Sequence, residues 1–492
     1  MSDLATCVGR AAVSYDPPRM AEHVLIAGGG VGGLTAALAL GRAGHRVTLL
    51  ERDVIDPPAD AEAAFAIERS GAPQVHQTHG FLARLQVTLR DRFPDVLDAL
   101  LAAGGTTMPM TSALGPARPG DEDLKVIIVR RSTLEWVLRR AVLGQDHVEV
   151  RTGIGVTGLH PSGADADGRP IVGGVVLDDG TVLEADAVVA ATGRRGPVPA
   201  WLAAIGVTVD ETEVESGLMY LTRWYHRPAE ALPPDPKLGG DLRFVKFLAV
   251  PGDGDTLSVT LAVPTDDGEL RAALSDPDRF DHACRLLPGP DLFFGGDAAP
   301  LTPIGGVRPM AGLVNRLRRF TDEAEQPLVL GFHALGDAHT TTNPLYGRGC
   351  ALAAVQACLL ADAFAAHPGD PLARAAVYEA GNRREVEPWY ESAVQMDQLG
   401  ADPAGGGAFG GGGDGGPGRA LAAVFAAAAT DPVIGRGIAR FMNLLQTPAQ
   451  LMADGELMTR IAEVVADPDA YPIPPRDGPG RRELLAALDP AA

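Results

Sequence analysis

The sequence predicts an α/β fold with three parts: a domain around a parallel sheet, a second domain built on a β-sheet, and a helical C-terminal region. Three observations predict it. An apolar strand, a glycine-rich turn, a helix and another strand follow one another within residues 23–51. Segments near residues 170–190, 217–228 and 256–263 alternate in polarity with the period of β-strands. Beyond residue 419, apolar residues recur with the spacing of helices.

Composition limits the classes of function. The chain has 492 residues, 46% of them hydrophobic, which is enough for two or three domains with a large core. Its net charge of −21 would repel nucleic-acid phosphates and anionic lipids, and no apolar run reaches the roughly 20 residues that span a bilayer. The four cysteines have no paired spacing. We therefore expect a cytoplasmic protein with no nucleic-acid partner, no membrane insertion and no metal site.

The first strand leads into the turn Gly28-x-Gly30-x-x-Gly33, a pattern typical of dinucleotide binding in this context. Gly28 permits the tight turn, Gly30 lets the backbone approach a pyrophosphate, and Gly33 lets the helix pack against its strand. The helix N-terminus offers free N–H groups to the phosphates. Glu51, at the end of the second strand, can accept hydrogen bonds from both ribose hydroxyls and would repel the 2′-phosphate of NADP. A glycine-rich turn in an ordinary α/β protein would leave this terminal acid unexplained.

Later segments bear on whether FAD or NAD binds. A helix predicted at 129–142 begins with a cation, Arg131, and turns an apolar stripe inward. A buried strand is predicted to end at Thr192-Gly193, and an apolar run over 328–336 ends on Asp337. A stretch with unusual backbone freedom opens the helix that follows, and it contains Pro344, Gly347 and Gly349.

Together these segments resemble the flavoprotein monooxygenases of the p-hydroxybenzoate hydroxylase fold, over residues 22–385 in outline. The resemblance implies a Rossmann-like FAD-binding domain of the glutathione reductase/p-hydroxybenzoate hydroxylase type. The glycine turn, Glu51 and Arg131 would bind the ADP half of FAD, and the Gly336-Asp337 pair would hold the ribityl chain and pyrophosphate. The stretch from Pro344 through Gly347 to Gly349 would pass beside the isoalloxazine, where a helix N-terminus suits the anionic reduced ring.

The segment "ERSGAPQVHQTHGF" (68–81) gives a narrower resemblance, to the FAD-dependent epoxidases and hydroxylases of polyketide and related pathways. In such proteins this segment lies close to the flavin. Arg69 is a candidate catalytic residue, because a cation there can stabilise the anionic reduced flavin. His79 is a second candidate. Gln77 stands where the nearest pattern often has a histidine, which leaves a direct acid–base role at this position open.

The segment "YLTRWYH" (220–226) supplies the third candidate catalytic residue, Arg223. As a strand it would place alternate side chains on opposite faces. One face would carry Tyr220, Thr222 and Trp224, and the other Leu221, Arg223 and Tyr225. One of the two faces should line the substrate pocket, and the sequence does not decide which.

The resemblance implies an FAD-dependent monooxygenase of secondary metabolism. It would insert one oxygen atom from O₂, by hydroxylation or epoxidation through a flavin C4a-hydroperoxide, into a lipophilic or aromatic small molecule. Electrons would come from NAD(P)H directly or through a separate flavin reductase. Thr192 favours the reductase, since many self-sufficient relatives carry Asp there.

Three alternatives stay open. The first is another flavin reaction, either halogenation or the reduction or dehydrogenation of a prenyl or polyketide chain. The second is a non-catalytic flavin-binding partner protein. The third, a nicotinamide dehydrogenase, would leave Asp337 and the loop beyond it unexplained.

The domain boundaries follow from these assignments. The FAD-binding domain is expected to be discontinuous, over residues 21–75, 120–205 and 325–385. The substrate domain is expected over 76–119 and 206–324, with residues 256–263 as a half-buried strand and the proline-rich loop 228–241 as a candidate lid.

The two ends of the chain are predicted to differ in order. Residues 1–20 should form a disordered leader. Residues 386–492 should form the helical region, interrupted by a glycine-rich linker at 404–418. A capping box with proline at the first helical position is predicted at Thr447-Pro448-Ala449-Gln450.

Overall fold

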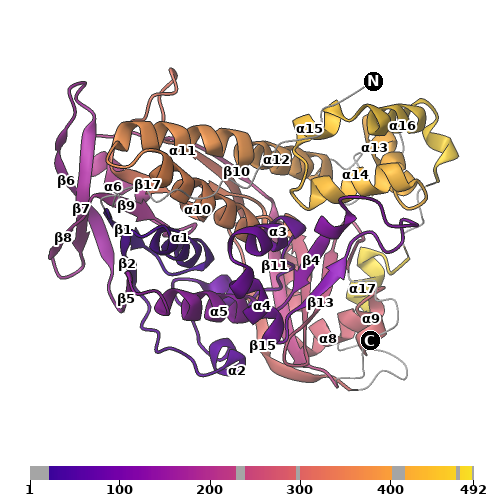
Figure 1. The fold of residues 1–492 in the computed structure, drawn as a ribbon. Helices are drawn as coiled ribbons and strands as arrows, with labels where there is room; N and C mark the ends of the chain where they lie inside the picture. Colours follow the sequence, from indigo (N-terminus) through magenta and orange to yellow (C-terminus); the bar gives the residue numbers. More distant parts are fainter. Residues whose placement is uncertain (1–20, 229–238, 295–299, 402–415, 473–476, 490–492) are drawn as a thin grey trace.

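The computed structural model describes residues 21–228, 239–294, 300–401, 416–472 and 477–489. The predicted leader lies outside these residues, as do most of the predicted linker and the central part of the predicted lid loop. The described residues form the expected parallel sheet, second sheet and C-terminal helices (Figure 1). The α/β fold class is therefore confirmed.

The first domain is built on a five-stranded sheet in which all neighbouring strands are parallel. Its central strands are buried along almost their whole length, as is usual for a parallel sheet covered on both faces. In spatial order the strands are β17 (Phe332–Ala334), β9 (Ala187–Ala190), β1 (His23–Ala27), β2 (Arg46–Glu51) and β5 (Val148–Thr152). This parallel arrangement confirms the Rossmann-like prediction.

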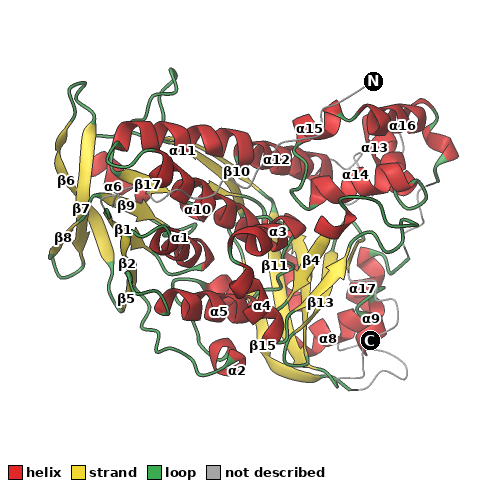
Figure 2. Ribbon diagram, in the orientation of Figure 1, coloured by secondary structure: helices red, strands yellow, loops and turns green. Residues whose placement is uncertain are grey.

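Helices cover one face of this sheet (Figure 2). Val24, Ile26 and Leu49 point into the core that these helices share, because alternate residues of a strand face opposite sides. The helices of this core are α1 (Val31–Arg42), α3 (Ala83–Arg92), α4 (Pro94–Ala102), α5 (Arg131–Leu143), α10 (Gly349–Ala366) and α11 (Pro371–Glu385). α10 is long and apolar enough to cross a membrane, but it is mostly buried inside the protein.

A small antiparallel sheet packs against the opposite face of the parallel sheet. Leu25, Ala27 and Leu50 contribute to this second core. The strands β9 and β17 also contribute, and opposite them lie residues of β6 (Val156–Ala164), β7 (Pro170–Leu177), β8 (Val182–Glu184) and α6 (Val198–Ala204).

The second domain is a five-stranded antiparallel sheet. In spatial order its strands are β12 (Gly239–Asp241), β13 (Lys246–Gly252), β14 (Thr256–Pro264), β11 (Leu218–His226) and β15 (Thr302–Met310). Helices cover the face that carries Leu221 and Tyr225. These helices are α7 (Gly268–Ser275), α8 (Pro277–Leu286), α9 (Asp291–Phe294) and α17 (Arg481–Ala487).

Short elements join the two domains. One small sheet has the order β10 (Asp210–Glu215), β16 (Val314–Arg319) and β18 (Thr340–Thr341), and another pairs β3 (Thr106–Pro109) with β4 (Lys125–Ile128). The remaining short helices are α2 (Ala61–Phe65), η1 (Pro73–His76), η2 (Asp121–Asp123), η3 (Gly336–Ala338) and η4 (Pro344–Tyr346).

The C-terminal helices form a separate cluster at the upper right of Figure 1. They are α13 (Gly416–Ala427), α14 (Pro432–Met442), α15 (Pro448–Ala453), α16 (Gly455–Ala466) and η5 (Pro468–Ala470), and α12 (Glu387–Ala401) precedes them. α13 begins at Gly416, inside the predicted linker. The capping box at Thr447 is confirmed, since its hydroxyl accepts from the Gln450 N–H and the Gln450 side chain accepts from the Thr447 N–H.

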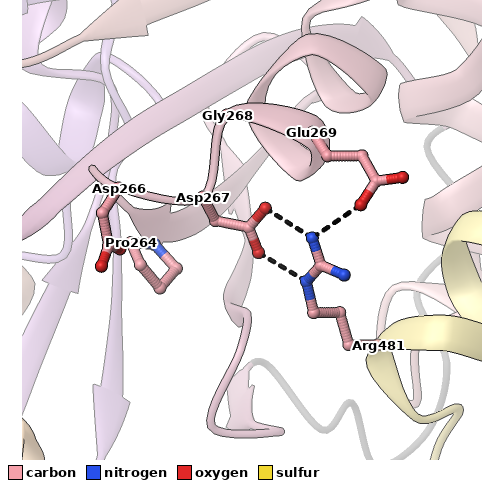
Figure 3. Close-up of a pocket in the computed structure, with 6 residues that line it drawn as sticks. All are labelled: Pro264, Asp266, Asp267, Gly268, Glu269 and Arg481. Atoms are coloured by element: carbon pink, nitrogen blue, oxygen red, sulfur yellow. Dashed lines mark hydrogen bonds and ion pairs between the residues drawn. The ribbon is translucent and has the colours of Figure 1, made fainter.

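The end of the chain returns to the second domain. Arg481, at the start of α17, donates through Nε and Nη2 to the two carboxylate oxygens of Asp267, at 2.7 Å each, and Nη2 also reaches Glu269. Figure 3 shows this fork across a shallow hollow beside Pro264. Leu484 and Leu488 anchor the same segment in the core of the second domain. These contacts fix the end of the chain against the helical side of the sheet.

Two predictions about packing differ from the structure. The strand over 256–263 was predicted to be half-buried, but β14 is buried on both faces, because α7 and α8 cover one side and residues 76–81 approach the other. Residues 83–102 were assigned to the substrate domain. Instead α3 and α4 share the core of α1 and α10.

Candidate functional site

Most of the predicted cofactor-binding residues lie near one edge of the parallel sheet. Gly28 follows β1, Thr192 lies just after β9, Gly336 follows β17, and Glu51 ends β2. Because all these strands are parallel, their carboxyl ends lie along the same edge. Ligands of open α/β sheets bind in the crevice outside such an edge.

The three motif glycines meet different surroundings. Gly28 has φ +114°, and a Cβ there would stand 2.3 Å from the carbonyl oxygen of Ala191. A Cβ at Gly33 would stand 1.8 Å from the carbonyl oxygen of Gly28. A Cβ at Gly30 would meet no atom within 4 Å. Gly28 and Gly33 are therefore required by the turn itself, whereas Gly30 leaves open space at the uncapped N-terminus of α1.

Glu51 is a buried carboxylate beside the glycine turn. It accepts from the backbone N–H of Gly29 at 2.9 Å and from that of Asp53 at 2.9 Å. Arg69 donates to it at 2.6 Å and also donates to Glu135 of α5. The sequence placed Arg69 beside the flavin ring. The structure instead places its guanidinium next to Glu51 and the glycine turn, so its predicted catalytic role does not fit its position.

Arg131 and His79 form the next part of the same network. Arg131 donates from Nε to Glu135 at 2.9 Å, and its Nη1 lies 3.3 Å from Nε2 of His79. Nδ1 of His79 lies 2.9 Å from the carbonyl oxygen of Gln77, which can only accept, so Nδ1 carries the proton and Nε2 accepts from Arg131. Burial and the charge of Arg131 lower the pKa of His79 to about 3. His79 is therefore neutral near pH 7 and cannot serve there as a proton-donating imidazolium.

Asp337 lies in η3, at the end of β17 and near the N-terminus of α10. Burial raises the pKa of its carboxyl group, against the lowering effect of the charges on Arg131, Arg194 and Arg316. Gly336, with φ +60°, donates its N–H to the side chain of Gln356 at 2.7 Å. Within the described residues no side-chain or backbone donor is bonded to the Asp337 carboxylate, so its oxygens can accept hydrogen bonds from a ligand.

The stretch from Pro344 to Gly349 lies between the two domains. Asn343 opens it and accepts from the N–H of Leu345. Gly347 has φ +67°, and a Cβ there would stand 3.2 Å from the carbonyl oxygen of Gly80. Gly349 begins α10. The two segments that carry the family resemblance, 68–81 and 344–349, are thus neighbours in space.

The residues present fit a dinucleotide such as FAD. Among the described residues, the buried polar atoms near the sheet edge that have no hydrogen-bond partner include the hydroxyl of Ser132, Nη1 of Arg139 and the hydroxyl of Thr192. Arg139 donates its other nitrogen, Nη2, to the carbonyl oxygen of Gly29 at 3.1 Å. Ser132 and Arg139 line a small cavity with Arg69, Glu135 and Trp136. Buried donors without partners are uncommon in native proteins, and a bound cofactor could supply acceptors for them.

The second domain turns one face of β11 toward this site. The Tyr220 hydroxyl donates to Oδ1 of Asn343 at 2.6 Å, the Thr222 hydroxyl donates to Gln77 at 2.6 Å, and Trp224 Nε1 donates to the carbonyl oxygen of His76 at 2.7 Å. The face that the sequence left undecided is therefore the one carrying Tyr220, Thr222 and Trp224.

Arg223 points away from the site. Its Nη1 donates to Asp281 of α8 at 2.6 Å and to the carbonyl oxygen of Pro277 at 2.8 Å. Tyr225, on the same face, also donates to Asp281. The prediction that Arg223 is catalytic is wrong, because α8 covers this side of the sheet.

Several residues of the site carry no sequence signal. Arg139 is an ordinary helix residue until the fold brings it to Gly29. Asp397, in α12, accepts from Asn343, just before the 344–349 stretch, and from Tyr346 within it, and nothing in its own sequence neighbourhood marks it. Arg139 is a polar residue on the inward, mostly apolar face of α5. This position indicates a role only once the glycine turn is known to lie beside it.

Comparison with known proteins supports the fold. No family model matches the chain. In sequence, residues of the chain are 31% identical over 185 positions to zeaxanthin epoxidase from Oryza sativa subsp. japonica, a match that covers 35% of this chain and 25% of that enzyme. The matched part is thus about a quarter of the rice enzyme's length.

Two solved structures show how far the likeness in fold extends. p-Nitrophenol 4-monooxygenase PnpA from Pseudomonas putida DLL-E4 has a TM-score of 0.59 and 18% identity, over 86% of this chain and 98% of that one. The flavin-dependent brominase Bmp2 has a TM-score of 0.53 and 14% identity, over 92% of this chain and 100% of the brominase chain. The chain therefore shares its fold with flavin-dependent oxygenating and brominating enzymes.

Proposed function

The chain has the fold of flavin monooxygenases of the p-hydroxybenzoate hydroxylase type, and we propose that it is an FAD-dependent monooxygenase. It would insert one oxygen atom of O₂ into a lipophilic or aromatic small molecule, by hydroxylation or epoxidation. Secondary metabolism is the setting that we propose for this activity.

One observation carries the proposal more than any other. Acceptor and donor groups suited to the two ends of FAD lie along a single sheet edge. Glu51 and the open Gly30 turn lie at one end, and the carboxylate of Asp337, in η3 near the N-terminus of α10, lies at the other. A nicotinamide dinucleotide would use the first end and leave the second without a role.

Different residues of the site would bind different parts of the cofactor. Glu51 would accept from the adenosine ribose, and the N–H groups at the start of α1 would donate to the pyrophosphate. Asp337 would accept from ribityl hydroxyls. The N-terminus of α10 would place its partial positive charge near the flavin ring, where it favours the anionic reduced form.

Bound FAD would supply the redox chemistry, since reduced flavin reacts with O₂ and can transfer one oxygen atom to an electron-rich carbon. The protein's own contribution is then exclusion of water and orientation of the substrate. Residues 76–81 and 343–346 cover the inner face of β11, which keeps that face out of bulk water. His79, held neutral, would orient Arg131 rather than transfer protons.

The substrate would bind on the side of the second sheet that carries Tyr220, Thr222 and Trp224, beside the segments 76–81 and 343–346 that cover this face of β11. The aromatic side chains of Tyr220 and Trp224 on this side suit a flat or lipophilic molecule. Electrons would come from NAD(P)H directly or, as the threonine at position 192 favours, through a separate flavin reductase.

Labelled oxygen tests the proposed reaction. The FAD-loaded protein would be reduced anaerobically, mixed with ¹⁸O₂ in the presence of bromide and a panel of phenols and polyenes, and the products weighed by mass spectrometry. A product that gains one ¹⁸O atom supports the proposal. A brominated product, or one that loses hydrogen without gaining ¹⁸O, would replace it with halogenation or dehydrogenation.

A further inference from the structure

A buried cluster ties the C-terminal helix α12 to the segment that the proposed function places beside the flavin ring. At its centre is the carboxylate of Asp397. It accepts from Nδ2 of Asn315 at 2.6 Å, from Nδ2 of Asn343 at 2.9 Å and from the hydroxyl of Tyr346 at 2.6 Å. The partners come from β16, from the residue before Pro344 and from η4. One carboxylate thus joins three segments that are distant in sequence.

The orientation of the Asn343 amide follows from these contacts. Its Nδ2 donates to Asp397, so its Oδ1 is turned to the opposite side, where it accepts from Tyr220 at 2.6 Å and from the Leu345 N–H at 3.0 Å. The backbone N–H of Asn343 donates to Oδ1 of Asn315 at 2.8 Å. Asn343 is fully buried. These hydrogen bonds hold the side chain and the backbone N–H of Asn343 in place where the chain enters Pro344.

Arg348 secures the other end of the same segment. Its guanidinium lies over the rings of Tyr346, Trp389 and Phe441, with 4.9, 5.4 and 6.0 Å from Cζ to the ring centroids. Nη1 donates to the carbonyl oxygen of Trp389, in α12, at 2.9 Å. Burial lowers the pKa of Arg348 to about 10, which leaves it charged at neutral pH. The side chain therefore points toward the C-terminal helices and away from the sheet edge.

We propose that Asp397 is a positioning residue for the flavin: through Asn343 and Tyr346 it holds residues 344–349 in the conformation that places the N-terminus of α10 at the ring. This inference rests on the proposed function. It makes α12, which contributes no residue to the sheet edge, a part of the active site, and it couples this segment to Tyr220 on the inner face of β11.

The test uses the full-length protein and the variant Asp397→Asn. An asparagine in the same rotamer would set its NH₂ group either against the donor of Asn315 or against the donors of Asn343 and Tyr346. We expect FAD to bind about tenfold more weakly, as for loss of a hydrogen bond to a charged group. We also expect a shift of the visible absorption maximum and of the midpoint potential of the bound flavin. A merely structural role would lower the unfolding temperature and leave the spectrum and potential of bound FAD unchanged.

Two further variants keep the test decisive. Glu391→Gln removes a carboxylate from an exposed position of the same helix and should match the wild type in all three readouts. Tyr346→Phe removes a single donor to Asp397, so it should shift the spectrum in the same direction even if Asp397→Asn fails to fold. Wild-type spectrum, potential and FAD affinity in both active-site variants would overturn the inference and leave the proposed function intact. A wild-type protein that does not bind FAD would instead overturn the proposed function.

Discussion

Nη2 of Arg69 lies 2.6 Å from Oε2 of Glu51, and both side chains are buried beside the glycine turn. The other guanidinium nitrogens, Nη1 and Nε, pair with Glu135 and Asp53, so Arg69 lies among three carboxylates. The sequence pointed to Glu51 as a ribose ligand and to Arg69 as a neighbour of the ring. Their direct pairing means that Arg69 acts on Glu51, and any effect of Arg69 on the flavin ring is indirect.

Removing this cation should cost both stability and affinity. Arg69→Met leaves Glu51 and Glu135 buried with less compensation, and we expect the free energy of unfolding to fall by about 3 kcal/mol. FAD should bind more weakly for the same reason. Urea denaturation without FAD and a fluorescence titration with FAD measure the two effects. Arg52→Met, which removes a neighbouring exposed arginine, is the control. An Arg69 variant as stable as the wild type would contradict the role given to the pair.

The glycines of the turn should separate folding from cofactor binding. Gly30→Ala adds a methyl group to open space, so the unfolding temperature without FAD should stay within about 1 °C of the wild type. FAD affinity should fall at least about tenfold, because the methyl group would occupy the position of the pyrophosphate. Gly33→Ala should lower the unfolding temperature itself, since its Cβ would overlap the carbonyl oxygen of Gly28. Equal affinity in Gly30→Ala and the wild type would mean that the pyrophosphate lies elsewhere.

Asp337 should show opposite effects on stability and on binding. Burial raises the pKa of this carboxyl in the folded state, so the folded protein holds the proton to higher pH than the unfolded chain does. The stability that the protonated Asp337 carboxyl contributes is therefore lost as pH rises from the pKa of the unfolded chain through the higher pKa of the folded state. Above the folded-state pKa the cost of burying the charged carboxylate is complete. Asp337→Asn removes the charge. Without FAD the variant should equal the wild type at acid pH and be more stable at pH 7, yet bind FAD more weakly.

Unfolding free energies at several pH values, with and without FAD, check this prediction. His160→Gln, a change at a residue on β6, serves as a control for the pH series. A variant that is less stable than the wild type at neutral pH without FAD would show that the carboxylate has favourable partners that the structure does not assign.

Substitutions at two neighbouring residues of β11, Thr222 and Arg223, should have different effects on stability and on kinetics. Arg223→Met leaves Asp281 without its cation, so we expect a lower unfolding temperature with little change in the Michaelis constant of any turned-over substrate. Thr222→Val keeps the shape but removes the buried hydroxyl that donates to Gln77, so we expect the Michaelis constant to change as segment 76–81 shifts, and the unfolding temperature to fall by less than in Arg223→Met. Steady-state kinetics beside thermal melts compare the two. A kinetic effect confined to Arg223 would restore the original prediction for that residue.

What the sequence could predict follows from how local each signal is. The glycine turn, the helix with Arg131 at its start and the capping box at Thr447 depend on neighbours within a few residues, and the structure contains each of them. The alternation of β11 was equally readable, because the period of a strand fixes which side chains share a face.

Which face of β11 is turned toward the site could not be predicted from the strand period. α8, more than fifty residues further along the chain, covers Arg223, and segment 76–81 approaches Thr222. Asp397 illustrates the same limit: its partner Asn343 lies 54 residues away, and a single aspartate on an exposed-looking helix carries no motif. Tertiary packing decided these positions, and one sequence contains no record of it.

The visible spectrum of the purified full-length protein tests most directly whether this chain is a flavoenzyme. It is recorded anaerobically after reconstitution with FAD, while NADH, NADPH and finally dithionite are added. We predict one tightly bound FAD per chain, an oxidised flavin spectrum that persists with both pyridine nucleotides, and bleaching with dithionite or a flavin reductase, followed by reoxidation on admission of O₂. Bleaching by NADH or NADPH alone would keep the flavoenzyme but reject the separate reductase. A folded protein that retains no FAD would contradict the proposal that this chain is an FAD-dependent monooxygenase.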